Sequence, residues 1–431
     1  MNAVAETGET VIRPEQVRVG VHVRIPLAWS QHAFLTSSFV VSNEQQVREI
    51  LAMGVEVLCD TRKCRVPPMP LVEIPAPDPA REAELATLRA EQEARMAVRR
   101  ERQAAMEAMR SRLDKVQKSF QQAAEQTAAA MHLLGARPKE SLKTILGVAG
   151  ESTNALLADT DSTILMVMDK GASQGEVAHA ISVMTLSLLL GKRLGIPAAV
   201  LREIGAGALL HDIGLASLNH SLVRNPKRNR FEEASYQTHC VRGHRELQAI
   251  GFVVPPEILN IALQHHEHYD GTGYPNRLSG TAICQGARIV ALADRFDELT
   301  NPPEPSGALS PFEALAQMWT RERSHFDETL LQHFIRSMGI YPPGTLVQLS
   351  DGRVAIVVAA APAEARLCPQ VLLYDAGTPR SEGIILDLAR PDPHDPEPLR
   401  IEKALRTQDL GTRELDYLLP RRRMSWLRAG P

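Results

Sequence analysis

The sequence predicts a mainly α-helical protein with a small α+β module at its N-terminus and a β-rich extension after the helices. Between residues 139 and 340, apolar residues recur at helical spacing in successive segments. Residues 341–395 contain two strand-like runs joined by Asp351-Gly352, which is a strong hairpin signal. A chain of 431 residues, 44% of them hydrophobic, is long enough for roughly two or three such domains.

The N-terminal module is expected over residues 11–70. QVRVGVHVRI alternates apolar and polar residues with the period of a strand, NEQQVREILAMGV reads as a short helix ending at Gly54, and VEVLCD reads as another strand. Cys59 and Cys64 have four residues between them, which is not a CxxC spacing. With five irregularly spaced cysteines in the chain, we expect a reduced protein whose thiols are structural and inert.

A long helix is predicted over residues 78–135, because the segment is rich in Ala, Glu, Arg and Gln and lacks Gly and Pro from residue 81 to residue 134. Its apolar residues Met106, Met109, Leu113, Val116 and Phe120 are spaced 3, 4, 3, 4 like a coiled-coil seam. Two interpretations follow. The seam packs against its own chain, or it forms a homodimer through residues 80–135.

The segment from 139 to 340 is expected to be a helical bundle. Its helices are predicted from HAISVMTLSLLLGKRLGI, AAVLREIGAGALLHDIG, FEEASYQTHCVRGHRELQAIG, PPEILNIALQHHEH and ARIVALADRFDELT. In the β-rich extension, PQVLLYDAG predicts a third strand. Residues 396–431, with the basic cluster PRRRMSW, are expected to form a solvated tail.

Composition narrows the class of partner. The formal net charge is −3, so the chain lacks the basic excess that is typical of proteins that bind polynucleotides. No uncharged apolar run approaches the roughly twenty residues of a membrane span, and the first sixteen residues have no signal-peptide pattern. We therefore expect a cytoplasmic protein.

Polar, proton-active side chains recur inside these apolar helices. A buried carboxylate is costly unless it is paired or bound to a metal, and helices in a bundle can direct such side chains toward one metal site. Imidazole and carboxylate ligands without cysteine favour iron, manganese or zinc. The candidate residues are His179, His211, Asp212, His239, His265, His266 and Asp294.

Adjacent His211 and Asp212 can serve two ions, because the histidine binds one ion and the carboxylate bridges both. Two ions about 3.5–4 Å apart activate water and neutralise a phosphoryl group. The residues alone therefore indicate hydrolysis of a phosphate ester or diester.

The motifs HDIG and HHEHYDGTGYP, in this order, resemble the HD-GYP family, a branch of the HD phosphohydrolases that degrades cyclic di-GMP. VAHAISVMTLSLLLGKRLGI, THCVRGH and ARIVALADRFDELT resemble its other ligand-bearing segments. EQVRVGVHVRI through CDTRKC resembles the domain of unknown function that often precedes it. The resemblance implies an HD-type helical bundle over residues 139–340.

The resemblance also implies roles for single residues. The seven candidates would hold two divalent ions, with iron or manganese expected, and His211 and Asp212 would be the catalytic pair. The substrate-binding residues would be Asp270, Gly271, Gly273, Tyr274, Pro275 and Arg288. The partners would be cyclic di-GMP and signalling proteins that contact the flanking modules.

Three positions depart from the family pattern. Leu215 stands where the family has a phosphate-binding lysine, and Asn225-Pro226 stands where it has a lysine-proline pair. Arg224, Lys227 or Arg228 are the candidates to compensate. Gly175 occupies the position of a glutamate that binds a third metal in some members, so two metals are expected.

Three functions remain open on the sequence. The first is a phosphodiesterase that converts cyclic di-GMP to pGpG or GMP. The second is a cyclic di-GMP binding or scaffold protein whose turnover Leu215 has weakened. The third is a hydrolase of another cyclic dinucleotide or nucleotide phosphoester.

Overall fold

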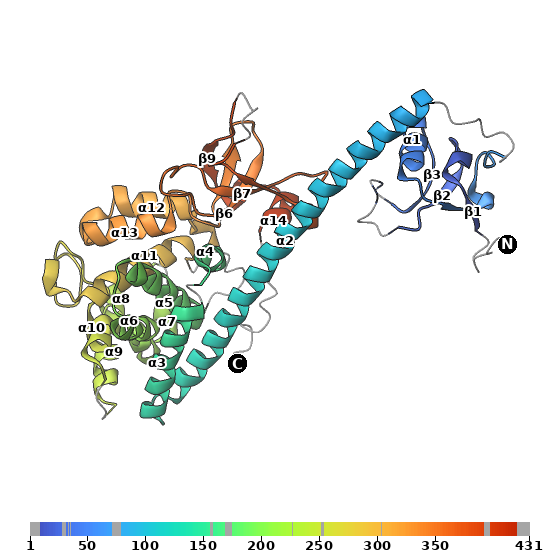
Figure 1. The fold of residues 1–431 in the computed structure, drawn as a ribbon. Coiled ribbons are helices and arrows are strands. Elements are labelled where there is room, and N and C mark those ends of the chain that lie inside the picture. The colour runs from blue at the N-terminus through green and yellow to red at the C-terminus, as the bar shows by residue number, and fades with distance from the viewer. Residues whose placement is uncertain are drawn as a thin grey trace. The chain divides into compact units, whose positions relative to one another are not determined.

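The computed structural model describes residues 9–27, 32, 34, 36–70, 79–155, 158–168, 175–225, 227–250, 254–302, 304–391 and 397–419. The chain divides into two compact units, residues 1–105 and residues 106–431 (Figure 1). The predicted basic cluster at 420–426 lies outside the described residues. Within the described ranges, none of the helices combines the length and the hydropathy that a bilayer-spanning segment needs.

The first unit is built on an antiparallel sheet of strand order β1-β4-β2-β3. Its elements are β1 (Thr10–Ile12), η1 (Pro14–Gln16), β2 (His22–Arg24), β3 (Ser38–Val40), α1 (Glu44–Met53), β4 (Val57–Cys59) and η3 (Thr61–Lys63). The predicted helix is confirmed, with Asn43 accepting from Gln46 N–H at its start and Gly54 in the left-handed region at its end. The strand expected over residues 16–25 covers only His22–Arg24, because the end of η1 and a turn occupy the first half of this range.

Helix α2 (Pro79–Leu133) runs without interruption through the segment predicted as one long helix. In the first unit its side chains bond to the end of α1, where Arg89 donates to the carbonyl of Ala52 at 2.9 Å and Gln92 to that of Glu49 at 3.1 Å. The bond to Ala52 satisfies a carbonyl that the last turn of α1 leaves without a helical partner.

The apolar seam of α2 packs against its own chain within the second unit. Met106, Met109 and Leu113 join a cluster with residues of the C-terminal sheet, and Val116 and Phe120 pack on the helical core. Of the two interpretations of the seam, the intramolecular one therefore holds for these five side chains. Their covered surface is not available to a coiled-coil partner.

The second unit contains a helical bundle around α5. Residues 180–191 of this helix are buried without exception, as expected for the central helix of a bundle. It packs against α6 and α11, and α6 packs in turn against α3 and α10. The helices are α3 (Pro138–Ala155), α4 (Thr160–Met168), α5 (Glu176–Arg193), α6 (Ala198–Leu210), η5 (Ile213–Ser217), α7 (His220–Arg224), α8 (Arg230–Tyr236), α9 (His239–Gln248), α10 (Pro256–Gln264), η6 (Gly280–Ala282), α11 (Gln285–Thr300), η7 (Pro305–Gly307), α12 (Pro311–Thr320), η8 (Arg323–His325) and α13 (Glu328–Met338).

A five-stranded antiparallel sheet of order β8-β7-β6-β5-β9 follows the helices. Its elements are β5 (Leu346–Leu349), β6 (Val354–Ala359), β7 (Gln370–Leu373), η9 (Arg380–Glu382), β8 (Ile384–Asp387), β9 (Ile401–Leu405), η10 (Thr407–Asp409) and α14 (Thr412–Leu418). The hairpin at Asp351-Gly352 is confirmed, with Gln348 opposite Val354. The sheet continues past residue 395, because β9 pairs with β5. Part of the range predicted as a tail is therefore an edge of the sheet.

Candidate metal centre

Seven polar side chains from five helices converge in the bundle. His179 lies in the first turn of α5, His211 and Asp212 follow α6, His239 begins α9, His265 and His266 follow α10, and Asp294 lies on α11. The side chains of His179, Asp212 and His266 are 25%, 26% and 19% exposed, while the others are almost fully buried. The cluster is therefore set deep in the bundle but reachable from one side.

The carboxylate of Asp212 faces two groups of ligand atoms, one with each oxygen. Its Oδ1 lies 3.3 Å from Nε2 of His239 and 3.6 Å from Nε2 of His265. Its Oδ2 lies 3.5 Å from Nε2 of His211 and 4.0 Å from Nε2 of His179. Asp212, His239, His265 and His266 form one group that could hold an ion, and His179, His211 and Asp294 form another.

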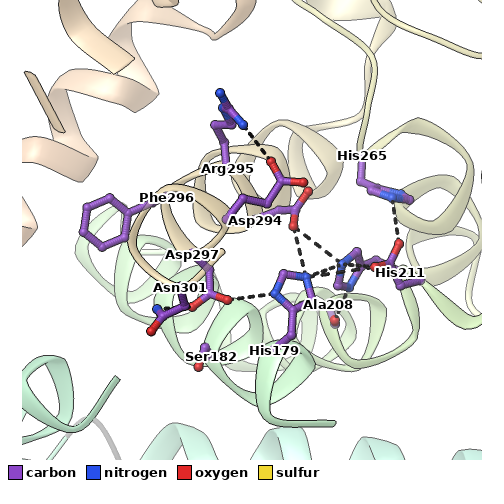
Figure 2. A network of polar contacts seen from close by, with 12 residues as sticks. His179, Ser182, Ala208, His211, His265, Asp294, Arg295, Phe296, Asp297 and Asn301 are labelled. Atoms are coloured by element: carbon purple, nitrogen blue, oxygen red, sulfur yellow. Dashed lines mark hydrogen bonds and ion pairs between the residues drawn. The ribbon is translucent and has the colours of Figure 1, made fainter. Parts of the chain in front are cut away.

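The second group is held together by Asp294. Figure 2 shows its carboxylate directed at His179 and His211, with Oδ1 3.1 Å from Nε2 of His179 and 3.8 Å from Nε2 of His211. Its Oδ2 lies 3.9 Å from Nδ1 of His266, which belongs to the first group. Asp294 and Asp212 thus both stand between the two groups.

Backbone carbonyls fix which nitrogen of three histidines points inward. The Nδ1 atoms of His211, His239 and His265 lie 2.7, 2.8 and 3.1 Å from the carbonyl oxygens of Ala208, Tyr236 and Ile261. Each Nδ1 therefore carries a proton that it donates, and a neutral ring presents the lone pair of Nε2 to the cluster. This is the tautomer that binds a metal through Nε2.

These lone pairs require a positive charge between them. Nε2 of His239 lies 3.3 Å from Nε2 of His265, so two neutral rings would place two lone pairs face to face. The buried Oδ1 of Asp212 accepts no hydrogen bond from the part of the chain that the structure describes. Divalent cations satisfy both features at once, and the donor set of imidazoles and carboxylates suits iron, manganese or zinc. The residues therefore fit the divalent metal binding that the sequence predicts.

The electrostatics of the cluster keep its carboxylates ionised. Burial alone would raise the pKa of Asp212, but the neighbouring His211, His265 and His239 outweigh it and hold the pKa well below its usual range. Burial opposes ionisation of Asp294 too, and the hydrogen bond from His179 lowers its pKa nevertheless. Burial lowers the pKa of three imidazoles, which favours their neutral, metal-binding form: His211, His239 and His266.

Asp297 is a buried member of the site that the sequence analysis did not identify. Its Oδ2 lies 2.8 Å from Nδ1 of His179, and its Oδ1 accepts from the side-chain amide of Asn301 at 3.2 Å (Figure 2). Although burial disfavours a charged ring, the bonds to Asp294 and Asp297 raise the pKa of His179 well above its usual value. The sequence signal was available, because Asp297 lies three residues after Asp294 on an apolar helix and so shares its face.

Two glycines allow the segment after His211-Asp212 to lie against α9. A Cβ on Gly214 would stand 2.1 Å from the carbonyl oxygen of His239 and 2.5 Å from the amide nitrogen of Gly243. A Cβ on Gly243 would stand 3.1 Å from the nitrogen of Gly214. This backbone contact sets the distance between Asp212 and His239, and it gives a physical reason for both glycines.

The DGTGYP loop lies beside the cluster. Gly271 has a φ of +80°, and a Cβ on Gly273 would stand 2.2 Å from the backbone nitrogen of His268, so both positions require glycine. The Tyr274 ring lies 4.8 Å from that of His266, centroid to centroid, and burial raises the pKa of its hydroxyl. Asp270 is exposed and accepts from the backbone and hydroxyl of Thr272, which closes the turn. Pro275 follows Tyr274 through a cis peptide bond.

Glu267 supports this loop and not a histidine. Its buried carboxylate accepts from the backbone of Asn276 at 2.7 Å and of Leu278 at 2.9 Å. Arg288 donates to Asp327, the N-cap of α13, at 2.6 Å. The structure therefore places this arginine in an ion pair, which does not support the substrate-binding role that the resemblance implies.

Leu215 is buried, with 8% of its surface exposed, and its N–H donates to the carbonyl of Asp212. Of the three cationic residues that follow, Arg224 and Lys227 are exposed. Arg228 is half-buried and lies over the ring of Tyr236, 3.8 Å from its centroid. The Tyr236 ring lies 5.1 Å from that of His239, and the Arg228 guanidinium also donates to the carboxylate of Glu233 at 2.8 Å. Pro226 is outside the described residues.

The helical bundle and its buried histidine–aspartate cluster define a metal-binding α-helical protein with two adjacent groups of ligand atoms, each of which contains one carboxylate. The family model of the HD domain matches residues 161–330, and that of a domain of unknown function, DUF3391, matches residues 10–145. Residues 161–330 are therefore an HD domain, and the resemblance to the HD-GYP branch is confirmed.

Three curated relatives are similar to part of this chain. The chain is 30% identical over 209 residues to "Cyclic di-GMP phosphodiesterase PA4108" of Pseudomonas aeruginosa, covering 48% of this chain and 50% of that protein. It is 33% identical over 151 residues to "Cyclic di-GMP phosphodiesterase response regulator RpfG" of Xanthomonas campestris pv. campestris, covering 34% and 39%. It is 34% identical over 140 residues to "3'3'-cGAMP-specific phosphodiesterase 1" of Vibrio cholerae, covering 32% of each. The matches span half or less of these relatives' lengths.

Proposed function

We propose that this protein is a metal-dependent phosphodiesterase that hydrolyses cyclic di-GMP to pGpG or GMP. The observation that carries the proposal is the orientation of Asp212, whose two oxygens face two separate groups of ligands. The activities named for the relatives support a cyclic dinucleotide as the substrate.

The proposed ligands are the seven residues of the cluster, and the ions are two divalent metals, iron or manganese. Asp212 would bridge the ions, with His239, His265 and His266 completing one site and His179, His211 and Asp294 the other. Ions bound here would supply positive charge to the phosphoryl oxygens and lower the pKa of a water molecule. His211 and Asp212 are the residues on which catalysis would depend.

The residues of the chain have distinct tasks in this reaction. The three histidines that donate from Nδ1 to carbonyls keep their Nε2 lone pairs directed inward. Tyr274, whose ring lies at a tilt beside that of His266, is placed to contact a substrate that binds at the cluster. Gly271, Gly273, Asp270 and Pro275 shape the loop that holds Tyr274. Arg288 is not part of this proposal, because it is paired with Asp327.

The test is metal analysis of anaerobically purified protein combined with a turnover assay on cyclic di-GMP. We expect two ions per chain and release of pGpG or GMP. Stoichiometric iron or manganese with no hydrolysis would reject the enzyme and leave the alternative, a binding or scaffold protein weakened at Leu215. In that case nucleotide binding should persist, and Leu215→Lys should restore or raise turnover.

A different cyclic dinucleotide is the second candidate substrate. The observation that favours it is the 34% identity to a 3'3'-cGAMP-specific relative, which is similar to the identity with the cyclic di-GMP enzymes. Competition between cyclic di-GMP and 3'3'-cGAMP in one reaction decides between them. The preferred substrate should suppress hydrolysis of the other at equal concentration.

We further propose that the N-terminal module contacts signalling proteins in the cytoplasm. A homodimer can use only those parts of residues 80–135 that the chain does not cover itself. Met109 and Val116 are buried in the second unit and are not available to a dimer, whereas Val98 is exposed. Sedimentation of the full chain, compared with a variant carrying Val98→Glu on the exposed surface of α2, tests this point.

A further inference from the structure

The N-terminal unit holds a pair of free thiols that the proposed hydrolysis does not use. Cys59 is the last residue of β4, and Cys64 follows η3. Their sulfur atoms lie 3.5 Å apart, and both cysteines are free. The spacing of the two cysteines in the sequence did not predict that their sulfurs lie close together, and we expected both thiols to be inert.

A short turn brings the two sulfurs together. Asp60 caps η3, with its side chain accepting from the N–H of Arg62 at 3.2 Å, and the single 3₁₀ turn returns the chain to the end of β4. Cys64 is held there by two bonds. Its sulfur accepts from the N–H of His22 on β2 at 3.2 Å, and its S–H donates to the carbonyl of Asp60 at 3.4 Å. The proximity is therefore built into the sheet.

The two thiols lie in different surroundings. Cys59 is fully buried, and burial together with the adjacent Cys64 raises the pKa of its thiol to about 12. Cys64 is only half-buried, and its sulfur is therefore the more accessible of the two. Cys64 is thus the thiol that reacts first with an external reagent, and Cys59 is the thiol that follows.

We propose that Cys59 and Cys64 are a redox-sensitive pair that a low-molecular-weight disulfide oxidises reversibly to an intramolecular disulfide. The Cys64 thiolate attacks one sulfur of the oxidant, breaks its S–S bond and expels one thiolate. The Cys59 sulfur then attacks the Cys64 sulfur and expels the second thiol, which takes the proton of Cys59. Two protein thiols are oxidised, and one disulfide is reduced to two thiols.

The position of the pair suits a reversible bond. The bond would close a loop of very few residues, and a disulfide stabilises a fold less the shorter the loop that it closes, so the reduced form keeps most of the stability of the fold. The bond would also tie down the end of β4, the strand that lies between β1 and β2 in the sheet. Disulfides in reducing compartments are usually transient and redox-sensing, which fits this arrangement.

The test exposes the full-length reduced protein to a glutathione/glutathione disulfide buffer, blocks remaining thiols under denaturing conditions and maps the peptides by mass spectrometry. Trypsin cuts after Arg62 and Lys63, so the bond joins two separate peptides, one ending at Arg62 and one containing Cys64. We expect this linked pair, two hydrogens lighter than the sum of its parts, to become the main form. Dithiothreitol should reverse it, and half-buried Cys368 should stay alkylated.

Two variants separate the roles of the thiols. Cys59→Ser should leave a glutathione adduct on Cys64, and Cys64→Ser should leave Cys59 as a thiol. Cys368→Ser is the control and should give the linked pair unchanged. Full alkylation of both cysteines, or a persistent glutathione adduct on Cys64 in the unsubstituted protein, would overturn the proposal. The unsubstituted protein decides the matter even if a variant fails to fold.

Discussion

Oδ2 of Asp297 lies 2.8 Å from Nδ1 of His179, although the two residues are 118 positions apart in the chain. The carboxylate fixes the orientation of the ring and leaves Nε2 directed at Asp294 and the cluster. In the proposed metal centre, Asp297 would therefore act through the ligand His179 and not as a ligand itself.

Replacing this carboxylate by an amide tests that relationship. Asp297→Asn keeps the shape but removes the charge, so we expect metal affinity at the His179 site to fall about 10–100-fold, as is typical for partners of ligating histidines. Competition with a metal-binding dye measures the affinity. Glu328→Gln, on α13 and paired with the exposed Arg323, is the control that should bind metal as before. Unchanged affinity in Asp297→Asn would contradict the assigned role.

Asp212 is expected to control both groups of ligands. Asp212→Asn should lose metal from both, and turnover should fall by more than the 10–100-fold that is typical of outer-shell losses. His239→Ala removes a ligand of one group only and should retain metal in the other. Asp270→Asn on the exposed loop is the control for the loss of one carboxylate. Metal counts per chain by elemental analysis distinguish the three variants, and a metal-replete Asp212→Asn would refute the bridging role.

The contact of Gly214 with α9 predicts a large effect from a single methyl group. In Gly214→Ala the new Cβ would meet the His239 carbonyl and the Gly243 nitrogen, which are backbone atoms, so the two segments must separate. Overpacking of this kind costs about 1–3 kcal/mol of unfolding free energy. Metal affinity should fall as well, because His239 moves away from Asp212.

Gly147 offers a matched control for that substitution. It lies inside α3, and a Cβ built on it meets nothing within 4 Å. Gly147→Ala should raise the free energy of unfolding by about 0.5–1 kcal/mol, because alanine is the better helix former. Urea unfolding curves measure both variants, and equal effects would show that the Gly214 contact is not tight.

A substitution at Glu267 should affect substrate binding without affecting metal binding. In Glu267→Gln, one of the two N–H donors of Asn276 and Leu278 faces an amide group that cannot accept, which costs about 1–3 kcal/mol. We expect metal content to stay the same and KM to rise, because the loop that carries Tyr274 loosens. Glu257→Gln, whose carboxylate accepts from Gly286 on the other side of α10, should leave KM unchanged. A loss of metal in Glu267→Gln would indicate a different role.

Arg228 is the residue most suited to replace the phosphate-binding lysine that Leu215 has displaced. A charge-assisted hydrogen bond contributes about 1.5–3 kcal/mol, so Arg228→Ala should lower kcat/KM by about one to two decades if the guanidinium reaches a phosphate. Lys227→Ala changes an exposed neighbour and should have little effect. Equal losses in the two variants would indicate a general effect of positive charge and not a specific contact.

The sequence alone determined the helical class of the protein, most of its helices and the seven cluster residues. Helical periodicity is local, and Gly54, Gly195 and Pro197 mark where helices end. The seven residues were recognisable because imidazoles and carboxylates inside apolar helices conflict with burial. The motifs HDIG and DGTGYP, which occur in this order, supported the same assignment.

Only the tertiary structure decided how these residues are shared between two groups and which neighbours support them. Three such contacts join distant segments of the chain. The two oxygens of Asp212 face different groups of ligands, Asp297 bonds to His179, and Arg288 pairs with Asp327. The same holds for the α2 seam, whose heptad-like spacing suits a partner helix as well as the chain's own core. Side-chain type and spacing restrict what a residue can do, whereas its actual partner depends on packing between segments that a local pattern does not specify.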